Sequence, residues 1–132
     1  MKKDEVVQFW LNGANEDWEF AQEIWKSGKR LYNALFFTQL ALEKILKALH
    51  YDLKDEHPLM THDLSLLARK LELQMDPKLE ADLKKISSFN ISARYDDYKF
   101  KFRREANVEF VTQWIKRSDE IKSYLLTLFS KK

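Results

Sequence analysis

Glycine and proline, the residues that most often interrupt regular structure, each occur only twice in these 132 residues. Because turns and strand ends depend on both, a chain this poor in them has few turns and a small number of long elements. Hydrophobic residues make up 45% of the chain, which is enough for one domain with a buried core. The sequence therefore predicts a single all-α domain over residues 1–132.

Three long stretches carry apolar side chains at helical spacing. The first runs from about residue 4 to 25, and Gly28 then offers a left-handed stop. The second, from about residue 31 to 53, is apolar over roughly half of its circumference, which predicts the most buried helix. The third runs from about residue 105 to 129. Together they predict the frame of an up-and-down antiparallel bundle.

Two shorter helices are expected between the second and third stretches. Thr61 offers a capping hydroxyl to the first of them, with Asp63 favourable in its opening turn. Asp76 followed by Pro77 is a cap and a first helical position, and that helix should reach about Phe89. The expected total is about five helices.

Bulk composition excludes several classes of function. The net charge of +2 implies no strong overall attraction to nucleic acid, so any basic patch must be local. The chain has no cysteine, and therefore no disulfide or thiolate chemistry. No two of its three histidines have the i, i+4 spacing of a zinc pair, so neither a metal nor a cofactor is expected. No stretch approaches the ~20 apolar residues of a membrane span and no signal peptide is evident, which predicts a cytoplasmic protein.

The second long helix carries an unusual polar row. Gln39, Glu43 and Lys47 recur every four residues, and Glu43 precedes Lys47 in the order that favours an ion pair. A solvated helix face would explain the row. However, Phe36 and Leu40 lie beside it on the helical wheel and argue against full solvation.

The segment Thr61-His62-Asp63-Leu64 places an imidazole near a helix start. Helix capping accounts for Thr61 and Asp63. His62 is less easily explained, and at such a position it suits a neutral base or a hydrogen-bonding group.

Residues 89–100 connect two helical patterns without a glycine or proline. Arg94 has five fixed donors that suit phosphate or carboxylate. Asp96 and Asp97 either hold this Arg, meet a metal or ribose, or close the loop onto the bundle in an internal salt bridge. Residues 99–104 then alternate aromatic and basic side chains. They could stack bases and bind phosphates, or form a short extended segment with its Phe side chains inward.

Three segments in order resemble the HEPN domain of small prokaryotic proteins: residues 32–50, residues 61–64 and residues 89–98. The resemblance covers almost the whole chain and implies an all-α up-and-down bundle that forms homodimers. It also implies nucleotide or RNA binding, and pairing with a minimal nucleotidyltransferase as a toxin–antitoxin-like system. Some members of the family are metal-independent ribonucleases.

Two departures from the family pattern stand out. The family's Ala-Arg-Tyr-Pro-Asp-like loop falls on residues 93–97, where Asp96 replaces the common proline. Ribonuclease members carry an Arg and a later His with four to six residues between them, but the positions at that spacing from Arg94, residues 99–101, are Lys, Phe and Lys, and the last His of the chain is His62.

These observations leave three hypotheses. In a binding module, Arg94 holds phosphate, Tyr95 or Tyr98 stacks on a base, Lys44 and Lys47 add positive charge, and Asn90 and Asp97 organise the loop. In a ribonuclease with a degenerate site, Arg94 stabilises the phosphate, and His62 or Tyr95 handles protons. In a structural partner, the loop merely closes the bundle.

The expected site combines side chains from all three segments. Its ligand-binding residues are Gln39, Glu43, Lys44, Lys47, His62, Asp63, Asn90, Arg94, Tyr95 and Asp97. We expect them to converge on one pocket, because such polar groups are not packed away from water without partners. We also expect a homodimer, because Phe36, Leu40 and the Trp-rich helices offer more apolar surface than one small bundle can cover.

Overall fold

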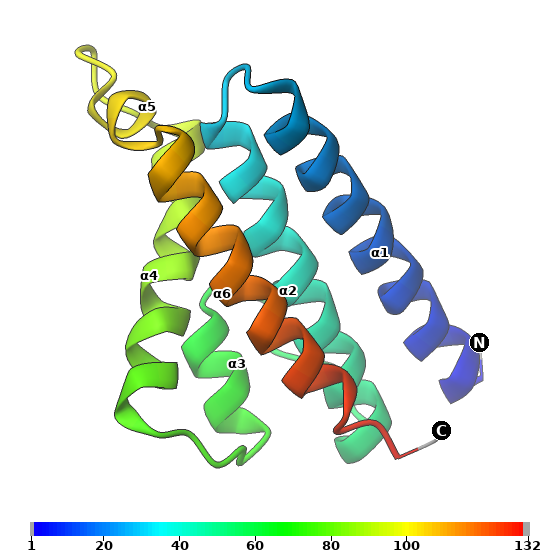
Figure 1. Ribbon diagram of the computed structural model, residues 1–132. Helices are drawn as coiled ribbons and strands as arrows, with labels where there is room; N and C mark the ends of the chain where they lie inside the picture. The colour runs from blue at the N-terminus through cyan, green and yellow to red at the C-terminus, as the bar shows by residue number, and fades with distance from the viewer. Residues whose placement is uncertain (1, 131–132) are drawn as a thin grey trace.

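The computed structural model describes residues 2–130, which form six helices and no strand. The helices are α1 (Lys3–Ser27), α2 (Tyr32–Lys54), α3 (Leu64–Lys70), α4 (Pro77–Arg94), α5 (Lys101–Glu105) and α6 (Val108–Leu126). The long helices α1, α2, α4 and α6 run up and down along one axis, whereas α5 projects from one end (Figure 1). The predicted all-α antiparallel bundle is confirmed. The sixth helix, α5, was not predicted. It overlaps residues 99–104, for which a short extended segment was one of two alternatives.

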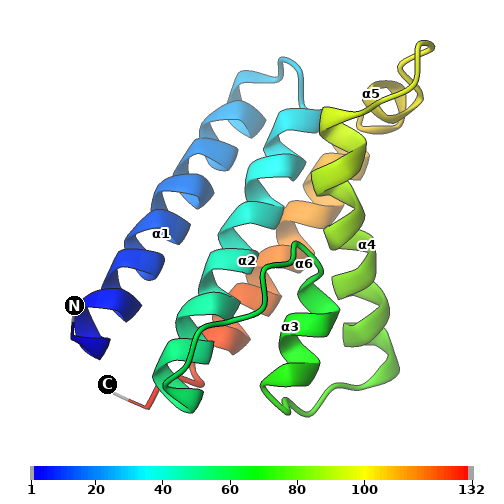
Figure 2. The same cartoon turned by 180° about the vertical axis from the view of Figure 1, so that it is seen from behind.

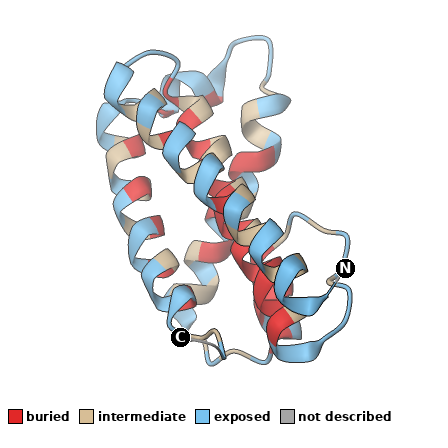
Figure 3. Ribbon diagram, turned by 90° about the vertical axis from the view of Figure 1, so that its right-hand side faces the viewer, coloured by how far each residue is buried: buried red, intermediate tan, exposed pale blue. Residues whose placement is uncertain are grey.

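Helix α2 is the central element of the bundle. It packs against α1, α3, α4 and α6, and buried residues follow one another along most of its length (Figure 3). Ala34, Ala41 and Ala48 recur every seven residues and have no exposed surface. Small side chains at this period let neighbouring helices approach closely. The prediction that α2 is the most buried long helix is confirmed.

Three helix ends differ from expectation, each because a side-chain cap or partner was misjudged. Asp63, not Thr61, caps α3: its carboxylate accepts from the backbone N–H of Ser65 at 3.0 Å, and a charged acceptor makes the stronger cap. Asn107 caps α6, accepting from the N–H of Phe110 at 2.9 Å, so this helix begins at Val108. Helix α4 continues five residues past Phe89 to Arg94.

The turn before α3 crosses the face of α2 opposite to α6. Figure 2 shows this turn in front of α2, while Figure 1 shows α6 in front of it. No helix in residues 2–130 has the length and apolarity that crossing a bilayer requires.

An ion pair joins α4 to α6. Arg117 Nε donates to Asp82 Oδ2 at 2.7 Å, and Lys78 Nζ donates to the same oxygen at 3.0 Å. Partial burial acts to raise the pKa of Asp82, but the hydrogen bonds and charges of Arg117 and Lys78 hold that pKa below its ordinary value. Burial acts to lower the pKa of Arg117, but its hydrogen bonds and charge interactions with Asp82 and Glu120 raise that pKa overall.

We expect Asp82→Asn to lower the free energy of unfolding by about 1 kcal/mol at neutral pH, because it removes the charge that Arg117 faces. A carboxyl whose folded pKa is depressed stabilises the fold above the unfolded pKa, here 3.8, and loses that contribution as pH falls through the folded pKa. Urea denaturation against pH measures both effects. Asp119→Asn, at an exposed position on the same helix as Arg117, is the control. Equal stabilities for the two variants would contradict the prediction.

Candidate functional site

One continuous chain of polar contacts links α2, α4 and the turn before α3. We call it the polar chain, and its members are Lys47, Glu43, Gln39, His62, Asn90 and Arg94. Their positions follow from helix geometry. The α2 members are spaced by four residues, as are the two on α4, so each set lies on one helix face.

Gln39 lies at the centre of the polar chain, with none of its surface exposed. Its Oε1 accepts from Asn90 Nδ2 at 2.8 Å. Its Nε2 donates to the backbone oxygen of His62 at 2.9 Å and to Glu43 Oε1 at 3.2 Å. A single amide thus satisfies groups from three separate segments, which is how a buried polar group avoids the cost of desolvation.

Glu43 is a buried carboxylate with three donors. Lys47 Nζ lies 2.9 Å from Oε2, so the cation serves as a buried counterion. His62 Nδ1 lies 2.8 Å from Oε1. Because an ionised carboxylate can only accept, the proton of a neutral His62 is on Nδ1 and its Nε2 is a free acceptor. The His62 side chain is 55% exposed, which leaves the ring accessible to solvent.

Arg94 forms the opposite end of the polar chain, at the last residue of α4. Its Nε donates to the backbone oxygen of Asn90 at 3.0 Å, and its Nη2 donates to Asn90 Oδ1. The guanidinium carbon lies 5.0 Å from the ring centroid of Tyr95 and 5.9 Å from that of Phe36. No carboxylate in residues 2–130 forms an ion pair with Arg94.

The two Asp residues after α4 bind backbone, not Arg94. Asp96 accepts from the N–H groups of Asp97, Phe102 and Arg103 at 2.9–3.0 Å. Asp97 accepts from those of Lys99 and Lys101 at 3.0 Å. Burial acts to raise the pKa of Asp96, but its backbone hydrogen bonds and the charge of Arg103 hold that pKa below its ordinary value. Of the alternatives left open by the sequence, a salt bridge from these carboxylates to Arg94 is not found in residues 2–130, and both side chains instead shape the start of α5.

Lys44 does not join the polar chain, contrary to expectation. Its ammonium lies 2.7 Å from Asp17 Oδ2 on α1. A Cβ at position 13 would lie 3.3 Å from Lys44 Cδ and 3.4 Å from its Nζ, so Gly13 inside α1 makes room for this ion pair. Asp63, another expected ligand, caps α3. Burial acts to raise its pKa, whereas bonds from the Ser65 hydroxyl and two backbone N–H groups lower it overall.

The polar chain is not an open pocket, which corrects a second expectation. Its side chains meet inside the protein, and separate hollows adjoin His62, which branches from Glu43 and Gln39, and the Arg94 end. His62 borders one of about 380 Å³ between the turn and α4. Beyond Arg94, Tyr95 and Asp97 border another of about 330 Å³ together with Lys101. Among residues 2–130, no group of three His, Asp or Glu side chains is placed to hold a metal.

Arg103 is a residue that the sequence did not single out. Its guanidinium carbon lies 4.5 Å from the ring centroids of both Tyr32 and Phe100. This contact fixes α5 against the start of α2. The alternation of aromatic and basic residues carried the signal, but nothing in it pointed to Tyr32, which lies 71 positions earlier in the chain.

A comparison with models of known protein families shows to which family the chain belongs. A model of the HEPN domain matches residues 7–128, nearly the whole chain. The chain belongs to the HEPN domain family. The resemblance read from the sequence is confirmed, and membership supports a nucleotide- or RNA-related module in general terms. Comparison with curated proteins and with solved structures found no significant match.

We expect Gln39→Leu to lower the free energy of unfolding by about 2–4 kcal/mol, because it leaves the Asn90 amide and the His62 carbonyl without their partner. The double variant with Gln39→Leu and Asn90→Leu should lose less stability than the sum of the losses in the two single variants. The difference, which is the coupling energy, should be about 1 kcal/mol or more. Chemical denaturation of the four proteins measures this coupling.

Thr38→Val is the matched control for that cycle. Thr38 is equally buried, but its hydroxyl bonds only to the Ala34 carbonyl of its own helix. Its effect should add to that of Asn90→Leu. Strict additivity of the Gln39 and Asn90 substitutions would contradict the structural role given to their hydrogen bond.

Proposed function

We propose that this HEPN domain binds the phosphate of a nucleotide or RNA at Arg94, as a homodimer that acts with a nucleotidyltransferase partner in a toxin–antitoxin-like pair. The proposal rests on the hydrogen bonds of Arg94 and on its lack of an ion pair within residues 2–130. Its guanidinium is oriented by Asn90 and faces no carboxylate within residues 2–130. Of its five donors, two are used, so the remainder are available to an anion.

Two aromatic rings, those of Phe36 and Tyr95, contact this guanidinium. Tyr95 is 70% exposed, and Tyr98, four residues after Arg94, is 84% exposed. Stacking of a base on such a ring is worth about 1–3 kcal/mol and tolerates any base. We therefore assign the phosphate to Arg94 and a base to Tyr95 or Tyr98.

Positive charge is concentrated next to Arg94. Residues 94–104 contain five Lys or Arg and two Asp, a local charge of +3 against +2 for the whole chain. This segment, not Lys44 and Lys47, supplies the attraction for phosphate, because both of those lysines are paired with carboxylates. The local basic patch allowed by the composition is thus assigned to the α4–α5 connection.

An exposed apolar patch beside Arg94 supports the proposed dimer. Phe20 is 46% exposed and packs edge-on against Phe37 at 4.6 Å, and Phe37 contacts Phe36 at 5.1 Å. Phe36 in turn contacts Arg94. A second copy covering this patch would bring its own Arg94 close to the first and deepen the site.

The nucleotidyltransferase partner rests on the family resemblance alone. A nucleotidyltransferase gene next to this one would support it. A purely structural role for the chain would leave the free donors of Arg94 unexplained.

A second candidate function is RNA cleavage at a degenerate site. The hydrogen bond from His62 to the buried Glu43 favours it, because a carboxylate orients the imidazole and leaves Nε2 free for proton transfer. In this alternative Arg94 stabilises charge on the phosphate, with Tyr95 as the other candidate for proton transfer. The absence of any Arg followed by a His with four to six residues between them argues against it.

Arg94→Ala should abolish nucleotide and RNA binding, a loss of at least about tenfold, while costing less than about 1 kcal/mol of stability. The reason is that its hydrogen bonds go only to Asn90, in the preceding turn of its own helix. Fluorescence anisotropy with labelled single-stranded RNA and labelled ATP, at one fixed salt concentration, measures binding.

Lys116→Ala, which removes an exposed cation from α6, should leave binding unchanged. If Arg94→Ala instead melts much lower while its folded fraction still binds, Arg94 is a structural clasp and the proposal fails. Shortening of the RNA by wild-type protein, lost in both Arg94→Ala and His62→Ala, would establish the cleavage alternative.

For the dimer, light scattering should give a mass of about twice the 15.9 kDa of one chain. Phe20→Glu, which introduces a charge into the exposed apolar patch, should shift the protein towards the monomer. Lys116→Glu is the control for added negative charge. A monomeric mass for the wild type at high concentration would count against the dimer.

A further inference from the structure

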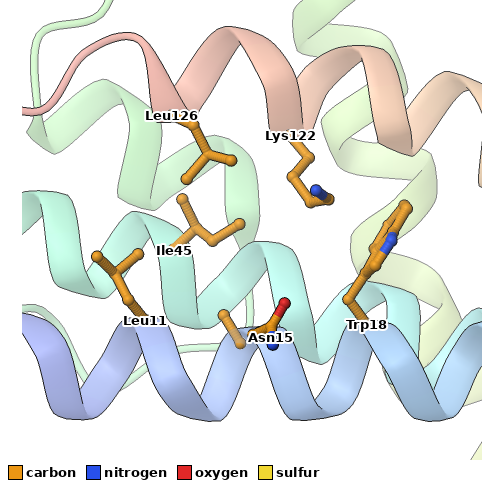
Figure 4. A pocket seen from close by; sticks show the side chains of 7 residues that line it. Leu11, Asn15, Trp18, Ile45, Lys122 and Leu126 are labelled. Atoms are coloured by element: carbon orange, nitrogen blue, oxygen red, sulfur yellow. The ribbon is translucent and has the colours of Figure 1, made fainter.

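A cleft separates α1 from α6 on the face of the bundle opposite to the turn that carries His62. Both helices pack on α2, which forms the floor of the cleft. The cavity measures about 200 Å³, and Figure 4 shows its lining side chains pointing into it from the three helices. Ala14 and Ile45, each 3% exposed, form its base. Nothing in the proposed function uses this cleft.

The cleft has one charged lining residue, Lys122 of α6. Its ammonium lies 5.0 Å from the ring centroid of Trp18 on α1, and Figure 4 shows the amine extending from α6 towards the cleft. Lys122 makes no ion pair with any residue from 2 to 130. No Asp or Glu lines the cavity, so its charge is complementary to an anion.

Two buried polar groups without partners lie one helical turn further along. Ser118, four residues before Lys122, has no exposed surface, and its hydroxyl makes no hydrogen bond. The side-chain nitrogen of Gln22, four residues after Trp18, is likewise buried without a partner. Because α1 and α6 run antiparallel, both groups lie at the same end. Buried polar groups without partners are rare in native proteins and call for an explanation.

A hydrogen bond closes the cleft beyond these groups. Trp25 Nε1 donates to Thr112 Oγ1 at 2.9 Å, joining α1 directly to α6. The cleft is therefore bounded at this end, and Leu11 and Leu126 line it beyond Trp18 and Lys122 at the other. A ligand entering between the helices meets Lys122 and Trp18 before it reaches the bonded pair.

We propose that this cleft binds a small organic carboxylate with one aromatic ring system. Lys122 pairs with the carboxylate, and Trp18 together with the aliphatic floor contacts the ring. The apolar lining disfavours a multiply charged, strongly hydrated anion such as free phosphate. The volume is below the ~300 Å³ at which pockets begin to take drug-sized molecules, so the ligand is compact.

The test compares two probes that differ only in charge, indole-3-acetate and its neutral analogue indole-3-acetamide. Two-dimensional ¹H–¹⁵N NMR follows the indole N–H of Trp18, assigned among the four tryptophans with a Trp18→Phe variant. The carboxylate should shift this resonance saturably, with a dissociation constant of about 1 mM or tighter, and the amide should bind at least about tenfold more weakly.

Lys122→Met keeps the length of the side chain and removes its charge, so it should weaken carboxylate binding by about tenfold. Lys116→Met, at an exposed position of the same helix, should leave binding unchanged. Arg94→Ala should also leave it unchanged, which separates this inference from the proposed phosphate site.

The proposal is overturned if the Trp18 resonance does not move at about 10 mM carboxylate, if acid and amide bind equally, or if Lys122→Met binds like the wild type. Should Lys122→Met melt below the wild type, Lys122→Gln replaces it. The comparison of acid and amide on the wild-type protein decides the question in either case.

Discussion

The side-chain amide of Gln39 is the contact on which the rest of the polar architecture depends. A buried amide must satisfy both of its ends, and here the partners come from α4, from the turn before α3 and from its own helix. Because these bonds are directional, they fix the rotation of α4 against α2. That rotation places Asn90, and Asn90 in turn holds the guanidinium of Arg94. An apolar residue at position 39 would pack equally well and specify none of this.

The bundle itself was predictable, because apolar periodicity is a property of each helix taken alone. The broad apolar arc of residues 31–53 identified the central helix without any knowledge of its neighbours. Helix ends were less predictable, since capping depends on which of several suitable side chains adopts the cap geometry. Asp63 took the capping role that the sequence pattern had given to Thr61, and Asn107 caps a helix whose start was expected near residue 105.

The predictions for individual site residues also succeeded where a single helix determines the position and failed where packing between helices does. Residues spaced by four on one helix, such as Gln39, Glu43 and Lys47, were grouped correctly because the helix dictates their common face. Lys44 was grouped with them by proximity in sequence, although one residue along a helix turns the side chain by about 100°, here towards Asp17 on α1. The Trp18–Lys122 cleft could not be predicted from the sequence, because Trp18 and Lys122 are 104 positions apart and come together only when α1 and α6 both pack on α2.

Asp96 lies where the resemblance to the HEPN family led us to expect a proline, and it orders the segment between α4 and α5 by a different means. A proline stiffens a chain covalently and permanently. Asp96 does so through three bonds to backbone N–H groups, next to Phe100 in the left-handed region at φ 55°. The geometry of this segment therefore depends on the charge of one carboxylate. Because the pKa of Asp96 is held below its ordinary value, its bonds persist at neutral pH and are lost as pH falls through the folded pKa, whereas a proline would fix its own φ at any pH.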